Sequence, residues 1–105
     1  MKGVEPPISR ATKRAILTLA KMIRVARIEK KDSQEVLAQR LGVSRQTVIA
    51  LEKGDTKVNI GTVFEAATIV GIPLFGENNR DLKLASALIE SMSTLLPKRS
   101  GRTQD

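Results

Sequence analysis

The chain contains no cysteine and no histidine among its 105 residues. The lack of cysteine excludes disulfides, thiolate nucleophiles and cysteine-ligated metal sites. The lack of histidine removes the commonest general base and the commonest zinc ligand. No glycine-rich phosphate loop is present, and the acidic residues are scattered along the sequence. We therefore expect a protein that is not an enzyme and that binds neither a metal nor a cofactor.

Aromatic residues are almost absent, since the chain has no Trp or Tyr and only two Phe, Phe64 and Phe75. The core must be built from Leu, Ile, Val and Ala, which favours packed helices. Single-stranded RNA is usually bound on exposed aromatic platforms, so this composition argues against that role.

Long apolar runs are also missing. The longest, "IVGIPLF" at residues 69–75, is too short and too broken to span a bilayer, and the N-terminus lacks the apolar region of a signal peptide. We expect a cytoplasmic protein without a membrane partner. The net charge of +7 suits a polyanionic partner, such as nucleic acid, an anionic membrane face or an acidic protein. The many cations of residues 10–31 either form a solvent-exposed helix face or line up beside a phosphate backbone.

Helical periodicity, capping residues and glycine or proline stops predict an all-α protein. The five expected helices cover residues 10–30, 34–41, 45–53, 60–70 and 80–96. Ser9, Ser33, Ser44 and Asn59 are the expected caps of the first four. We expect a flexible N-terminus at residues 1–8, a main helical domain at 9–75, a C-terminal helix for dimer or partner contact at 76–97 and a flexible tail at 98–105.

The stretch "LAQRLGVSRQTVIALEKG", residues 37–54, has the requirements of a helix-turn-helix unit. Ala38 is small where two helices cross closely, and Gly42 permits the turn. The apolar positions expected to face the shared core are Leu37, Leu41, Val43, Val48 and Leu51.

The opposite face of the second helix in this unit is expected to be exposed. It carries Arg45, Gln46, Ile49, Ala50 and Lys53. Such a face fits the major groove, where Arg pairs with guanine and Gln with adenine, and apolar groups touch the thymine methyl. An alternative for Ile49 is packing against another part of the protein.

The run "SQEVLAQRLGVSRQTVIALEKGDTKVNIGTVFEAATIVGI", residues 33–72, resembles the Xre/Cro class of helix-turn-helix regulators. The resemblance covers roughly Leu19 to Ile72. It implies the five-helix phage-repressor-like fold and a sequence-specific repressor of double-stranded DNA. The resemblance implies that Arg45, Gln46 and Ala50 contact the bases. It also implies phosphate-contacting, bracing or capping roles for Gln34, Ser44, Thr47, Lys53 and Lys57. For Ser44 the alternative is a cap alone.

The same resemblance implies a partly buried ion pair between Arg27 and Glu52, which would tie the first helix to the third. The alternative is two unrelated surface charges.

The fifth helix carries a wide apolar stripe at Leu82, Ala85, Leu88, Ile89, Met92, Leu95 and Leu96. Part of it is expected to pack on the first and fourth helices, and part would form a two-fold contact in a homodimer that reads a palindromic operator. The alternative is a stripe used entirely inside one monomer.

The tract "IGTVFEAATIVGIPLF" and the basic tail "LLPKRSGRTQD" more narrowly resemble HipB-type antitoxins. This implies a protein that represses its own operon within a toxin-antitoxin system and binds a HipA-type kinase toxin. In the alternative reading, binding that toxin is its main role. The chain departs from this pattern at Pro97 and the polar tail, where some members carry an extra strand that pairs across the dimer.

Overall fold

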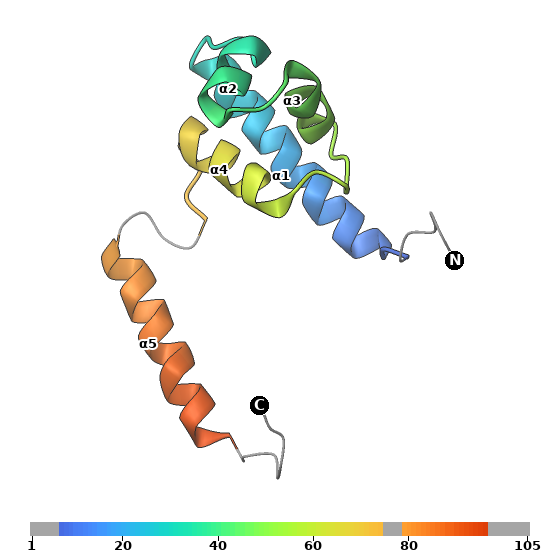
Figure 1. The fold of residues 1–105 in the computed structure, drawn as a ribbon. Coiled ribbons are helices and arrows are strands. Elements are labelled where there is room, and N and C mark those ends of the chain that lie inside the picture. Colours follow the sequence, from blue (N-terminus) through green and yellow to red (C-terminus); the bar gives the residue numbers. More distant parts are fainter. Residues whose placement is uncertain (1–6, 75–78, 97–105) are drawn as a thin grey trace. The chain divides into compact units, whose positions relative to one another are not determined.

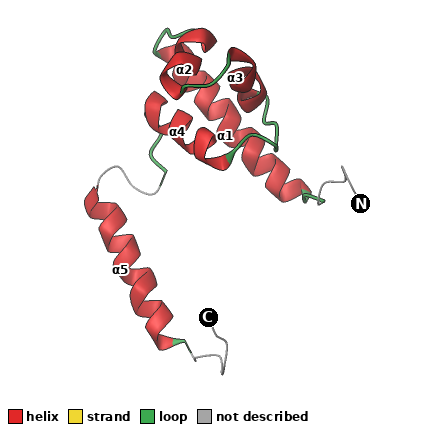
Figure 2. Ribbon diagram, viewed as in Figure 1, coloured by secondary structure: helices red, strands yellow, loops and turns green. Residues whose placement is uncertain are grey.

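The computed structural model describes residues 7–74 and 79–96, and this part of the chain consists of helices joined by loops, with no strand (Figure 2). The helices are α1 (Arg10–Glu29), α2 (Gln34–Leu41), α3 (Arg45–Glu52), α4 (Ile60–Val70) and α5 (Asn79–Leu95). The all-α, five-helix prediction is therefore confirmed. Most of the predicted flexible N-terminus, the proline stop at residue 97 and the predicted tail lie outside the described residues.

Each predicted cap of the first four helices is made by the expected side chain. Ser9, Ser33 and Ser44 accept hydrogen bonds from the backbone N–H three residues on, over 3.1–3.2 Å. Asn59 accepts from the N–H of Gly61 over 2.7 Å. Such caps satisfy donors that a helix leaves without internal partners, which is why they predict the start of a helix well. Gly42 and Gly71 end α2 and α4 in the left-handed conformation.

The chain divides between Leu74 and Phe75 into two compact units. In the first, α3 and α4 pack on α1, and α2 packs on α3 and α4 (Figure 1). Its core is small and aliphatic, as the scarcity of aromatic residues implied. The buried cluster consists of Ile23, Leu37, Ala38, Val48, Leu51, Ala66, Ala67 and Val70. Ala38 is 2% exposed, so the small residue expected at the crossing of α2 and α3 is enclosed. Leu41 and Val43 are partly buried against this cluster.

The second unit contains α5, in which the large apolar side chains from Leu84 onward are open to solvent, whereas the side chain of Leu82 lies outside the described residues. The exposed large residues of this helix and its end are Leu84, Leu88, Ile89, Met92, Leu95 and Leu96. None of the helices in the described part of the chain has the length and apolar character that a bilayer crossing requires.

Candidate nucleic-acid interface

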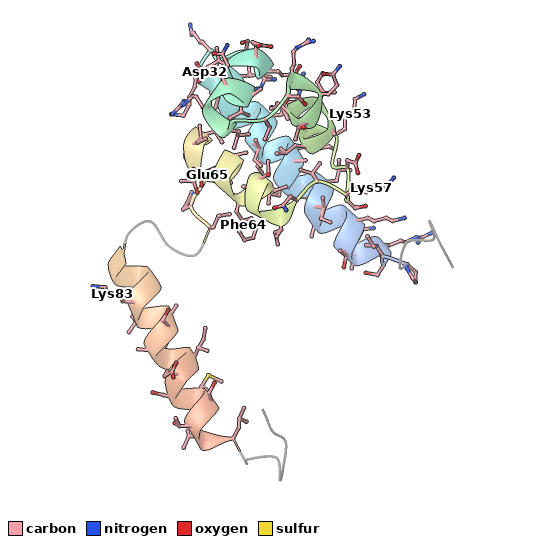
Figure 3. All side chains as sticks on the ribbon, in the orientation of Figure 1. Asp32, Lys53, Lys57, Phe64, Glu65 and Lys83 are labelled. Atoms are coloured by element: carbon pink, nitrogen blue, oxygen red, sulfur yellow. The ribbon has the colours of Figure 1, made fainter. Side chains whose placement is uncertain are left out.

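The outer face of α3 presents polar and cationic side chains at its start and its end. Arg45 and Gln46 are exposed on the first turn, and Lys53 is exposed as the C-cap residue. Lys57 is also exposed in the loop that follows. Figure 3 shows Lys53 and Lys57 along the edge formed by α3 and this loop. Four of the residues predicted to contact DNA therefore reach solvent on or beside α3.

The two apolar residues of this face are half-buried, which corrects the expectation of a fully exposed stripe. Ile49 lies between Arg45 and Lys53, because residues four apart are neighbours on a helix, and these long side chains can cover part of it. The chain turns back after α3, so that the backbone N–H of Asp55 donates to the carbonyl of Ala50 over 3.0 Å. Ile49 is not among the partly buried residues that pack on the core cluster of the described chain. A contact with a partner is thus still available to it.

Ser44 and Thr47 are occupied with each other at the start of α3. The Ser44 hydroxyl accepts from the Thr47 N–H over 3.2 Å, and the two hydroxyl oxygens are 3.0 Å apart. The capping alternative for Ser44 is therefore present in the structure. A phosphate contact by either residue stays a prediction. It would use the partial positive charge at the helix N-terminus.

A buried ion pair joins α1 to α3 behind this face. Arg27 donates from Nε to Glu52 Oε2 over 2.7 Å and from Nη2 to Glu52 Oε1 over 3.0 Å. The two side chains are only 9% and 2% exposed. The third guanidinium nitrogen, Nη1, donates to the carbonyl oxygen of Asp32 over 2.7 Å. The contact is thus buried and bidentate, and it is more enclosed than the partly buried pair that the sequence suggested.

Gln34 extends this network to α2. Its Nε2 donates to Glu52 Oε1 over 3.1 Å, so the Glu52 carboxylate receives three hydrogen bonds from two helices. The network thus fixes the first residue of α2 and the last residue of α3 relative to α1. The resemblance suggested that Gln34 braces the recognition helix. It did not show Glu52 as the partner or the Asp32 carbonyl as the third anchor. A predicted phosphate contact by Gln34 stays untested.

A hollow of about 380 Å³ opens beside this network. It is lined by Arg24, Arg27, Ser33, Gln34, Glu35 and Arg45. Arg24 was not singled out from the sequence as a binding residue. The available signal was its position three residues before Arg27, which places both on one side of the same helix.

The family described as helix-turn-helix matches residues 23–76, about half of the chain. An uncharacterized HTH-type transcriptional regulator of Methanocaldococcus jannaschii is 45% identical over 42 residues, which are 40% of this chain and 64% of that protein. The transcriptional repressor RstR of the cryptic phage CTXphi of Vibrio cholerae is 36% identical over 77 residues. That match covers 67% of this chain and 69% of the repressor. No solved structure matches the chain.

Proposed function

The chain belongs to the helix-turn-helix family, and we propose that it is a sequence-specific, double-stranded DNA-binding repressor of transcription. In this proposal the protein acts in the cytoplasm, by binding and without catalysis. The observation that carries it is the exposed Arg45–Gln46 pair on a helix that a buried ion pair holds in place. The names of the two relatives agree with it, because both are given as regulators of transcription and one as a repressor.

In this mechanism α3 enters the major groove with its first turn against the base edges. Arg45 can bridge the O6 and N7 atoms of guanine, and Gln46 the N6 and N7 atoms of adenine. Ile49 and Ala50 would lie against thymine methyl groups. The flanking cations Lys53 and Lys57 would contact the phosphate backbone, which sets the register without reading sequence.

Replacing Arg45 and Gln46 together by alanine is expected to remove base discrimination. Each bidentate side chain–base pair contributes roughly 1–3 kcal/mol of discrimination, so the preference should fall at least about tenfold. Binding to the DNA upstream of the protein's own gene is compared with binding to a scrambled duplex over a salt series. The double variant should keep only salt-sensitive, sequence-blind binding. If wild-type protein and variant prefer the upstream duplex equally, α3 does not read it.

We further propose that the repressor works as a homodimer on a palindromic operator, with α5 supplying the two-fold contact. A lone helix of this length is marginal in water, and a wide exposed apolar stripe is costly unless something covers it. A symmetric dimer would place two recognition helices about 34 Å apart, one turn of DNA.

A charge in this stripe should separate the dimer. Leu88 is 59% exposed in α5, and Leu88→Lys would place an ammonium group in the proposed contact. Thr94→Lys adds the same charge to an exposed position on the other side of the helix and serves as the control. Light scattering should give one chain mass for the first variant and two for wild type and control. If all three have the same mass, α5 is not the dimer contact.

The finer role that we propose is autorepression of an operon encoding a toxin-antitoxin pair, with this chain as its HipB-like component. It rests on the resemblance at residues 60–75 and the basic tail. In the alternative, the main partner is a HipA-type kinase toxin, and DNA binding is secondary. Deleting residues 76–105 distinguishes the roles, because it should impair dimerisation or toxin binding more than base preference. In some related operons a separate small protein neutralises the toxin, so toxin neutralisation must be assayed with this chain alone.

A further inference from the structure

The hollow beside α3 collects positive charge from two helices. Arg24 comes from α1 and Arg45 from the first turn of α3, while Ser33, Gln34 and Glu35 line it at the start of α2. Arg24 and Arg45 are both exposed. Neither forms a hydrogen bond or an ion pair with any residue in the described part of the chain. Two guanidinium groups thus line one hollow, and neither has a partner among residues 7–74 and 79–96.

The acidic groups nearby do not neutralise these two arginines. The Glu52 carboxylate is already engaged by Arg27 and Gln34. Glu35 lines the same hollow but forms no ion pair with Arg24 or Arg45 within the described residues. When the buried pair is included, the cations are Arg24, Arg27 and Arg45, and the carboxylates are those of Glu35 and Glu52. Cations therefore outnumber carboxylates here by three to two. Like charges repel unless an anion lies between them, so the arrangement favours a bound anion.

The chemistry of the lining suits a phosphate group. Guanidinium forks match phosphate oxygens in bidentate geometry, and Arg24 supplies such a fork to this hollow. Arg45, whose fork is assigned to a base, adds positive charge beside it. The N–H groups of Gln34 and Glu35, on the first turn of α2, add donors that have no acceptor within the helix, whereas that of Val36 is capped by Ser33. Because Arg45 begins the helix assigned to the major groove, the nearest anion in a complex would belong to the DNA backbone.

We propose that this hollow seats one backbone phosphate of the DNA and that Arg24 of α1 is a phosphate-contacting residue. Arg24 thereby extends the interface beyond the helix-turn-helix unit, and Glu35 sets its strength by opposing the phosphate. This inference rests on the proposed function in one respect, namely that DNA is the ligand. It does not require that the protein recognises a particular sequence. A phosphate contact strengthens specific and sequence-blind binding alike.

Arg24→Ala is compared with Arg14→Ala, which removes the same charge from an exposed position on α1 outside the hollow. Each phosphate contact contributes about 0.9 to the slope of log K against log salt concentration. We expect Arg24→Ala to reduce the slope by about that amount on both the upstream and the scrambled duplex, with their affinity ratio unchanged. Arg24→Lys should retain most of the slope. If Arg24→Ala and Arg14→Ala have equal slopes, the proposal fails.

Glu35→Gln tests the same phosphate site by a change that should raise the affinity for DNA instead of lowering it. Removing this carboxylate should raise affinity for both duplexes several-fold at low salt. Glu65→Gln makes the same change of charge at an exposed position on α4, outside the lining of the hollow, and should raise it less. Equal gains would show a general charge effect and overturn the proposal. Circular dichroism confirms that each variant is folded.

The two proposals can fail separately. If wild-type protein does not distinguish the upstream duplex from the scrambled one, the assignment as a sequence-specific repressor is wrong. The comparison of Arg24→Ala with Arg14→Ala still reports on the phosphate seat, because it can be made on sequence-blind binding.

Discussion

Replacing Arg27 by alanine is expected to lower the free energy of unfolding by about 3–5 kcal/mol, a large part of the stability of a small domain. The cause is the carboxylate left behind. The Glu52 side chain is 2% exposed, and two of its three hydrogen bonds come from Arg27. Without that guanidinium, a buried charge retains only the amide of Gln34. Urea denaturation followed by circular dichroism measures the loss.

A second ion pair in the same domain provides the control. Arg40 and Asp32 are 3.6 Å apart with side chains 51% and 29% exposed. Exposed pairs contribute little, so Arg40→Ala should cost about 1 kcal/mol or less. The double variant Arg27→Met/Glu52→Leu removes both charges and should be more stable than either Arg27→Ala or Glu52→Ala. If Arg27→Ala costs no more than Arg40→Ala, the buried pair does not hold α1 and α3 together.

Gly54→Ala is expected to be the other strongly destabilising change, with a loss of about 2–4 kcal/mol. Gly54 has a φ of +81°, which a residue with a Cβ rarely adopts. A Cβ built there would lie 3.0 Å from Leu17 Cδ1 and 3.2 Å from Leu17 Cα. The second contact is with the backbone of α1, which cannot move aside as a side chain can. The end of α3 would therefore have to shift, and thermal unfolding should show a lower midpoint.

Gly42→Ala separates backbone strain from the close approach. Gly42 has a similar φ of +73°, but nothing lies within 4 Å of the position of an added Cβ. Its substitution should cost only the strain, roughly 1–2 kcal/mol. Adding Leu17→Ala to Gly54→Ala should not restore stability, because Leu17 Cα remains in place. Equal losses for the two glycine variants would show that the contact with α1 is unimportant.

The sequence predicted the helices well because their ends depend on local chemistry. The serine and asparagine caps and the left-handed glycines act within a few residues, so α4 has its predicted bounds of 60–70. The apolar periodicity placed α5 at 80–96, displaced by one residue from Asn79–Leu95. The core positions of the helix-turn-helix unit followed from spacing for the same reason. The pair of Arg27 and Glu52 came from a family resemblance, since residues 25 positions apart give no local signal.

The missing details arise where distant segments meet. Nothing near Gln34 in the sequence indicates that its amide reaches Glu52, and nothing near Gly54 indicates that it lies against α1. The half-burial of Ala50 was also missed, and that of Ile49 stood only as an alternative, because a helical face drawn from the sequence omits covering by neighbouring side chains and by the returning chain. The hollow shared by Arg24 and Arg45 depends on how three helices pack, which spacing along one helix does not show.

The central claim is that the exposed face of α3 reads the base sequence of DNA. Its most direct test is selection of bound duplexes from a random-sequence pool by the purified wild-type protein. We predict enrichment of one short motif in two inverted copies, with centres about 10 base pairs apart, as two symmetric recognition helices require. Folded protein that enriches no sequence above the starting pool would contradict the account.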